Sequence, residues 1–165
     1  MIQLARPLFI LLLVVSATLI IATTGQLPAQ VASHFGAGGA ANGAMTRGGY
    51  LIFMLAFAVG LPIMMVLGMA VLPRLRPTSI NIPHREYWLD PARRDATLRY
   101  IEAQAYWLGS LMTVFIAAIH LLLIEANATQ PPRLPGAPFG ALMAMFVAAL
   151  ALWMVMLIMH FRRPR

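Results

Sequence analysis

The chain has 165 residues, of which 61% are hydrophobic and only 10% are charged. Soluble globular proteins carry about a quarter charged residues, so this chain has too little polar surface to face water on all sides. Its net charge of +7 comes from arginines that lie between apolar blocks, a distribution that argues against nucleic-acid binding. The absence of cysteine excludes disulfides, zinc–thiolate sites and cysteine nucleophiles.

Four apolar segments are long enough to cross a bilayer, which takes about 20 residues of helix. They predict an all-α integral membrane protein, a single four-transmembrane-helix bundle over residues 1–165. The expected spans are about 7–24, 50–72, 105–124 and 139–161, joined by loops at 25–49, 73–104 and 125–138. The first segment resembles a signal peptide, but its apolar block is long, so we expect an uncleaved helix.

The first loop is rich in glycine, and its Asn42-Gly43 pair is typical of a tight turn. Leu27, Val31 and Phe35 are spaced by four, which predicts a short helix lying on the membrane surface. The loop lacks the Gly-Lys-Ser/Thr ending of a phosphate-binding loop, so we expect its glycines to serve turns.

The last three spans each carry small residues at intervals of four or eight positions, a spacing that lets helix backbones approach closely in lipid. These rows are Ala56, Gly60 and Gly68; Gly109, Thr113 and Ala117; and Gly140, Ala144 and Ala148. We expect the rows to hold the protein's own bundle, with docking to a partner's helix as the alternative. Pro62 should kink the second span, because proline removes one backbone hydrogen bond.

The second loop begins with an extended, proline-rich stretch and then places Tyr87 and Trp88 at the level of the lipid headgroups. Asp90-Pro91 marks a helix start, from which one helix is expected to run unbroken into the third span. From Pro91 to Glu125 that helix would be about 52 Å long, so about a third of it must project from the membrane.

The arginines predict the orientation of the spans. Ten lie on one side, namely Arg6, Arg74, Arg76, Arg85, Arg93, Arg94, Arg99, Arg162, Arg163 and Arg165, and only Arg47 and Arg133 lie on the other. The positive-inside rule places the ten in the cytoplasm. We therefore expect a multi-pass protein of the bacterial inner membrane with both termini, and the extension of the third helix, on the cytoplasmic side.

Two short motifs in these loops resemble a family of small bacterial membrane proteins. The first comprises Leu27-Pro28, His34-Phe35, Gly39, Asn42-Gly43 and Arg47, and the second comprises Asn81-Ile82-Pro83, Glu86-Tyr87-Trp88 and Arg93-Arg94. The family includes the immunity protein that protects a sporulating bacterium from its own sporulation-delaying toxin. Ala40 and Ala41 stand where the family often has an acidic residue.

The resemblance implies a four-helix unit with no known enzymatic activity. In the immunity branch it implies toxin resistance and signalling through sequestration of a transcription regulator. We expect contacts with a partner within the two motifs, at Asn42, Gly43, Arg47, Tyr87, Trp88, Arg93 and Arg94.

His34, His120 and Glu125 are expected at or near the outer face. Two imidazoles and a carboxylate can bind zinc or another divalent ion, and an ionisable residue inside a span suggests a function. One alternative is structural, in which His120 bonds a backbone carbonyl or Glu125 while His34 supports the turn, and another is contact with a partner. We expect no other cofactor.

No serine has an acid and a histidine placed to activate it, and the spans lack the repeated acids of a transporter. The sequence therefore favours a non-catalytic interaction protein, an immunity, signalling or accessory subunit whose partner is another membrane protein or a peptide. The alternative is a small carrier or metal-handling protein that uses His34, His120 and Glu125.

Overall fold

The computed structural model describes residues 2–76 and 80–162. Within these ranges, four helical segments are long and apolar enough to cross a membrane: Gln3–Thr24, Arg47–Leu75, Arg94–Asn127 and Gly136–Arg162. They fit a mostly helical, multi-pass membrane protein and include all four predicted spans. Arg163 and Arg165, which belong to the larger arginine group, lie outside the described residues.

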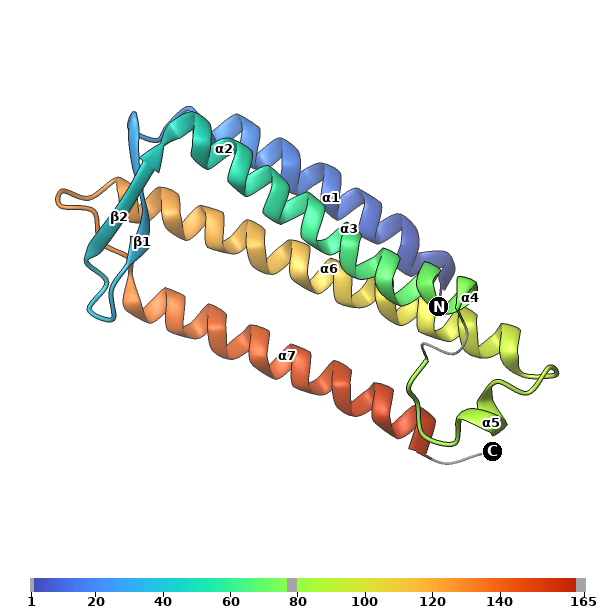
Figure 1. The fold of residues 1–165 in the computed structure, drawn as a ribbon. Coiled ribbons are helices and arrows are strands. Elements are labelled where there is room, and N and C mark those ends of the chain that lie inside the picture. Colours follow the sequence, from blue (N-terminus) through green and yellow to red (C-terminus); the bar gives the residue numbers. More distant parts are fainter. Residues whose placement is uncertain (1, 77–79, 163–165) are drawn as a thin grey trace.

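Helix α6 (Arg94–Asn127) lies in the middle of the molecule, beside α1 (Ile2–Thr24) and beside the second span (Figure 1). These three helical segments share two apolar cores. The core nearer the chain reversal at Gly25 contains Ile20, Tyr50, Met54, Ile116 and Leu123, and the other contains Phe9, Val66, Ala70 and Ala105.

The second span is continuous but not uniformly α-helical. It consists of α2 (Arg47–Leu55), η1 (Ala56–Gly60), α3 (Leu61–Val66), η2 (Leu67–Val71) and α4 (Leu72–Leu75). The segments η1 and η2 are π-helical, and each precedes a proline, Pro62 and Pro73 respectively. Because proline cannot donate the backbone bond of an α-helical turn, a widened turn is a common accommodation.

The two π-helical turns keep one face of the second span on the core. Its buried residues recur at every fourth position, as Tyr50, Met54, Ala58, Pro62, Val66 and Ala70. In a regular α-helix, each residue of such a row is rotated about the helix axis by about 40° relative to the previous one, which amounts to about 200° over the five intervals. Each π-helical turn holds one extra residue and turns the row back by about 100°, so two of them cancel the drift.

Only one of the three small-residue rows lies in the core of the bundle. A Cβ atom added to Gly109 of α6 would lie 2.8 Å from Phe9 Cε2 and 2.8 Å from Val66 Cγ2, so this row does let helices approach closely. In the second span, Ala56 and Gly68 are exposed. The last span's row, Gly140, Ala144 and Ala148, is exposed throughout. The expectation that every row holds the protein's own bundle is therefore wrong for these two.

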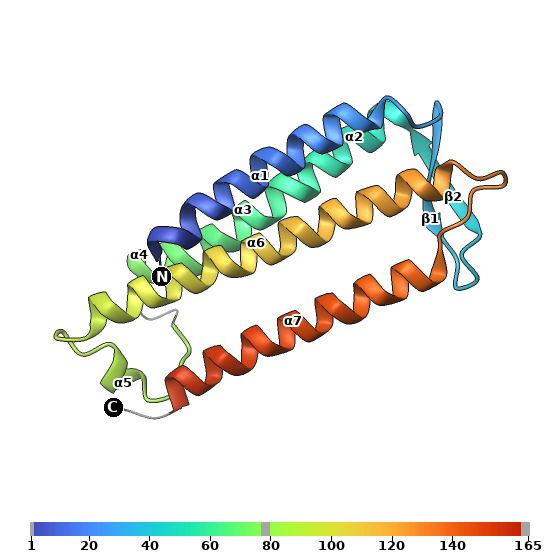
Figure 2. The same ribbon diagram turned by 180° about the vertical axis from the view of Figure 1, so that it is seen from behind.

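Helix α7 (Gly136–Arg162) lies alongside α6 and away from α1 (Figures 1 and 2). None of the residues in its apolar 18-residue window is buried. One contact is a ring stack of Phe146 on Phe115, with centroids 4.0 Å apart. Toward the end of α7, Phe161 lies in an apolar cluster with Ile80, Leu98 and Ile101, and His160 stacks on Tyr100 with ring centroids 3.6 Å apart.

The first loop forms an antiparallel hairpin of β1 (Gln30–Phe35) and β2 (Ala41–Thr46) instead of the expected surface helix. The turn lies at Gly36–Ala40, where Gly36 N donates to Ala40 O at 2.9 Å and Gly39 has a φ of 76°. A positive φ favours glycine, which explains why the turn forms here. The expectation of a turn at Asn42-Gly43 is wrong, since both residues belong to β2.

At the end of the molecule opposite the hairpin, the chain forms the short helix α5 (Arg85–Trp88) and then enters α6. Helix α6 begins at Arg94 rather than at Pro91, because Asp90 Oδ1 accepts a bond from Ala92 N at 3.0 Å and closes a turn first. Figure 1 shows the first turns of α6 extending past the end of α4.

The same end contains the start of α1, the end of α4 and the end of α7 (Figure 1). The described arginines of the larger group therefore gather toward one end of the helices, while Arg47 and Arg133 lie toward the hairpin end.

Candidate functional site

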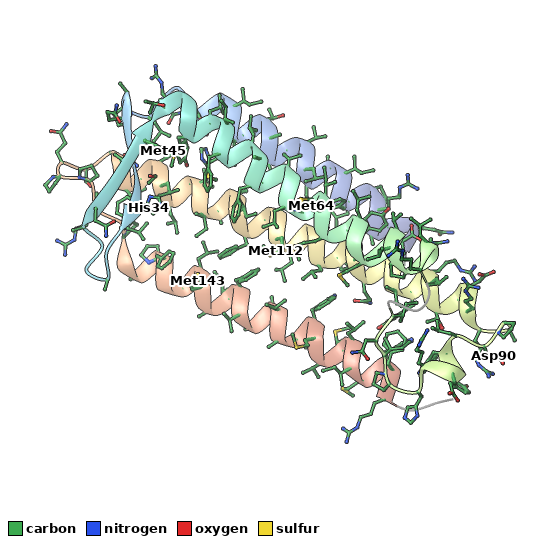
Figure 3. The ribbon with its side chains drawn as sticks, viewed as in Figure 1. His34, Met45, Met64, Asp90, Met112 and Met143 are labelled. Carbon is green, nitrogen blue, oxygen red and sulfur yellow. The ribbon has the colours of Figure 1, made fainter. Side chains whose placement is uncertain are left out.

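The structure does not bring together the three residues expected to bind a metal. His120 is completely buried in α6, whereas Glu125 is exposed. His34 is exposed on β1, at the opposite end of the molecule from Asp90 (Figure 3), and its Nδ1 lies 3.1 Å from Ser33 Oγ. Among the described residues, no group of three or more His, Cys, Asp or Glu side chains is placed to hold a metal ion.

His120 instead connects three helices through hydroxyl groups. Its Nε2 lies 2.7 Å from Thr23 Oγ1 of α1, and its Nδ1 lies 2.8 Å from the Tyr50 hydroxyl of α2. The Thr23 hydroxyl donates its proton to Leu19 O at 2.6 Å, so it must accept from Nε2–H. For a neutral His120 this places the ring proton on Nε2, so that the Tyr50 hydroxyl donates to Nδ1.

His120 is thus paired inside the bundle, as the structural alternative expected, but with two hydroxyl groups rather than with Glu125 or a backbone carbonyl. Thr23 and Tyr50 had no signal in the sequence that linked them to His120. Since both ring nitrogens are paired inside the bundle, the structure assigns His120 a role in holding helices together.

The hairpin is attached to the helices by Asn127 at the end of α6. Its Oδ1 accepts from Ala32 N at 2.8 Å, and its Nδ2 donates to Ala32 O at 3.0 Å. The side-chain amide thereby pairs with β1 as a further strand would. No pattern in the sequence linked Asn127 to the first loop, so this role is found only in the structure.

Two further sets of bonds hold the hairpin end. Arg47 Nη1 donates to Leu27 O at 3.1 Å and to Gly25 O at 3.3 Å, which ties the start of α2 to the segment before β1. Leu134 N donates to Gly39 O at 2.9 Å, which ties the hairpin turn to the segment before α7. Arg47, expected to contact a partner, thus has an internal role.

A pocket of about 450 Å³ opens between the hairpin turn and the start of α7. The glycine turn, Phe35, Leu134 and Phe139 form its walls, and Arg133 is the one charged side chain that lines it. Arg133 Nη2 donates to Gly38 O at 3.3 Å, across the mouth of the turn. Among the described residues that line it, the pocket offers one cation and apolar walls, but no acid or histidine to act as a base.

The exposed small residues of α7 continue from this pocket. Gly136 lines the pocket, and Gly140, Ala144 and Ala148 follow it at intervals of four, all exposed. A Cβ atom added at Gly136 or Gly140 would meet nothing within 4 Å. The α7 face, defined as these four residues, exposes backbone to close approach along more than three turns of helix.

The motif residues at the other end hold α5 in place. The Arg93 guanidinium lies over the Tyr87 ring, 4.0 Å from its centroid, and its Nε donates to Tyr87 O at 2.9 Å. Trp88 Nε1 donates to Phe161 O at 3.3 Å, which ties α5 to the end of α7. Three of the expected partner contacts are therefore engaged within the chain, and Arg94 is exposed.

In the hairpin motif, Asn42 is exposed, whereas Gly43 is constrained by its neighbour across the hairpin. A Cβ atom added to Gly43 would lie 3.1 Å from His34 Cβ, tighter than most such contacts. The glycine thus permits the close pairing with β1, which is irregular at this point.

Residues 11–59 match the model of a family described as Domain of unknown function (DUF1648). The match runs from α1 through the hairpin and into η1, so the hairpin lies at its centre. No curated protein and no solved structure matches the chain.

Proposed function

We propose that this protein is a non-catalytic interaction protein of the bacterial inner membrane, which binds a transmembrane helix of a partner protein along the α7 face. The observation that carries the proposal is the exposed row from Gly136 to Ala148 on a span with no buried residue in its apolar window. In lipid, helix association depends on close backbone packing, and small residues at a spacing of four are enriched at such interfaces.

The pocket beside Arg133 supports a second contact with the same partner. Because Gly136 belongs to both the pocket and the α7 face, a helix packed along α7 would bring its adjoining loop or terminus to the pocket. The single guanidinium favours an acidic or carboxyl-terminal group there. Recognition would then combine helix packing within the membrane with one polar contact outside it.

The arginine distribution supports a hairpin on the outer side and both termini in the cytoplasm. The resemblance to the immunity family and the match at residues 11–59 both include the hairpin, which forms one wall of the pocket. These features favour an immunity, signalling or accessory subunit. A metal carrier is disfavoured, because His34, His120 and Glu125 lie apart from one another.

Photo-cross-linking from position 144 in native membranes tests the proposal directly. We expect a cross-link to a distinct membrane protein, and Ala144→Leu should reduce the amount of that protein that co-purifies by at least about fivefold. Ala22→Leu is the matched control, because it makes the same exchange at an exposed position of α1. Cross-links to lipid alone, or equal co-purification with both variants, would contradict the proposal.

A further inference from the structure

The hairpin has two edges, and the end of α6 pairs with only one of them. Asn127 bonds both Ala32 N and Ala32 O, so the backbone groups of Ala32 point away from β2. In an antiparallel pair, two residues that lie opposite each other either bond each other or both point their backbone groups outward. Ala44 of β2 lies opposite Ala32. Its N–H and C=O must therefore point outward on the other side of the hairpin.

The same alternation places the N–H of Thr46 on that side. Arg47 N donates to Ala29 O at 3.0 Å, so the next pair, Thr46 with Gln30, is an outward-pointing one. We call the N–H and C=O of Ala44 and the N–H of Thr46 the β2 edge. Both residues are exposed, and these three groups bond to none of the described residues outside the hairpin.

The β2 edge lacks the usual protection against pairing with another strand. Exposed edges are commonly blocked by charged side chains, proline or β-bulges. The sequence of β2, ANGAMT, contains no charge and no proline. The two register shifts of the hairpin lie nearer the turn, between Ala32 and Phe35 of β1, and leave the pairing at Ala44–Thr46 regular.

Charge selects the kind of strand that fits this edge. Arg47 directly follows β2, and Arg133 pairs with Ala40 at the other end of the strand. Both guanidinium groups bond only backbone carbonyls within the described chain, so their charges are not neutralised. Residues 25–49 and 125–138 carry these two arginines and a single acid, Glu125.

These charges disfavour a second copy of the chain and favour an acidic partner. Two β2 strands related by a twofold axis would pair antiparallel and bring the Arg47 end of each copy to the Arg133 end of the other. Like charges that meet across a strand pair are destabilising. An acidic strand would instead meet a guanidinium at each end.

We propose that the β2 edge binds an acidic peptide in an extended conformation, which adds a third strand to the hairpin. The peptide backbone accepts hydrogen bonds from Ala44 N and Thr46 N and donates one to Ala44 O, as in other cases of strand addition. Because these contacts read the backbone, the site tolerates different peptide side chains. It is separate from the α7 face and does not depend on the proposed helix partner.

Fluorescence anisotropy of a labelled peptide, added to the full-length protein in phosphatidylcholine nanodiscs, tests the proposal. The probe is Glu-Thr-Val-Thr-Val-Thr-Glu, and a second probe has the same side chains but is N-methylated at every internal residue. The second probe keeps the charge but loses the backbone donors. We expect it to bind at least about tenfold more weakly than the first.

Ala44→Pro removes one outward N–H and places a ring at the edge, but it leaves the bonds between β1 and β2 in place. It should weaken binding of the first probe at least about fivefold. Ala37→Pro is the matched control, because Ala37 is exposed in the hairpin turn and its N–H bonds to none of the described residues. Proline is favoured at this position of a turn, so Ala37→Pro should bind like the unsubstituted protein.

Equal binding of the two probes overturns the proposal even if a variant fails to fold. The proposal also fails if folded Ala44→Pro binds as tightly as Ala37→Pro, or if the first probe binds the unsubstituted protein no better than empty nanodiscs. A dimer of the protein that Ala44→Pro dissociates would assign the β2 edge to a second copy and overturn the proposal too. Ala144→Leu should leave peptide binding unchanged, so the tests of the β2 edge and of the α7 face can fail separately.

Discussion

A histidine inside an apolar span is stable only if its ring nitrogens are paired, and His120 meets this condition. The bonds run in one direction, from the Tyr50 hydroxyl through the imidazole to the Thr23 hydroxyl and on to Leu19 O. Each group donates one proton and accepts one, apart from the two ends. The chain of bonds thus joins α1, α2 and α6 near the hairpin, where a polar cross-link fixes their register.

Tyr50→Phe should destabilise the protein by about 1–3 kcal/mol, because it leaves His120 Nδ1 buried without a donor. Thermal unfolding in detergent, followed by circular dichroism, measures the effect. Tyr106→Phe is the matched control, since the Tyr106 ring packs against Phe9 while its hydroxyl has no hydrogen bond in the described structure. An equal change in the two variants would show that the Tyr50–His120 bond contributes nothing.

The sequence marks His120 as an ionisable group within a span, but it carries no sign of the partners of His120. Thr23 and Tyr50 are 97 and 70 residues away from it in the chain. Which hydroxyl meets which ring nitrogen depends on the rotation of three helices about their axes. Apolar segments as uniform as these carry little information on that rotation.

At the scale of elements, the length of the apolar segments predicted where the spans lie, whereas the spacing of apolar residues in the first loop did not predict the hairpin. Leu27, Val31 and Phe35 are four apart, which fits one face of a helix but also one face of a strand, since four is a multiple of two. The glycine turn and the β-branched Val31 favour the strand. The π-helical turns also had a signal, because Pro62 and Pro73 each interrupt the second span.

Asn127→Ala should loosen the hairpin without unfolding the helices, because the lost amide supplies two bonds to Ala32 at the edge of β1. We expect backbone amides of β1 to exchange with deuterium at least about fivefold faster, while exchange in the centre of α6 stays unchanged. Hydrogen exchange with mass spectrometry measures both regions. Asn42→Ala, an exposed position on β2, is the control and should leave β1 protection intact.

On the scale of the whole molecule, the chain divides into a tight three-span unit and a loosely attached fourth span. The α1, second-span and α6 segments share cores that include polar and apolar contacts. Helix α7 is tied at its two ends, through Leu134 to the hairpin turn and through Phe161 to Trp88. Between these ties lies the α7 face, so the proposed partner-binding region belongs to the least covered span.

The orientation of the protein in the membrane decides which compartment the hairpin end and the opposite end face. Reporter fusions can measure this orientation. We expect a reporter active only in the periplasm to be inactive when fused after Arg165 and active when inserted into the hairpin turn at Gly38. The physical reason is that ten arginines lie on the side of the termini and two on the hairpin side, and translocating the larger group is disfavoured. A cytoplasm-dependent reporter at the same two positions should give the opposite pattern. Periplasmic activity after Arg165 would reverse the orientation and place the Arg133 pocket in the cytoplasm, where an extracellular toxin could not reach it.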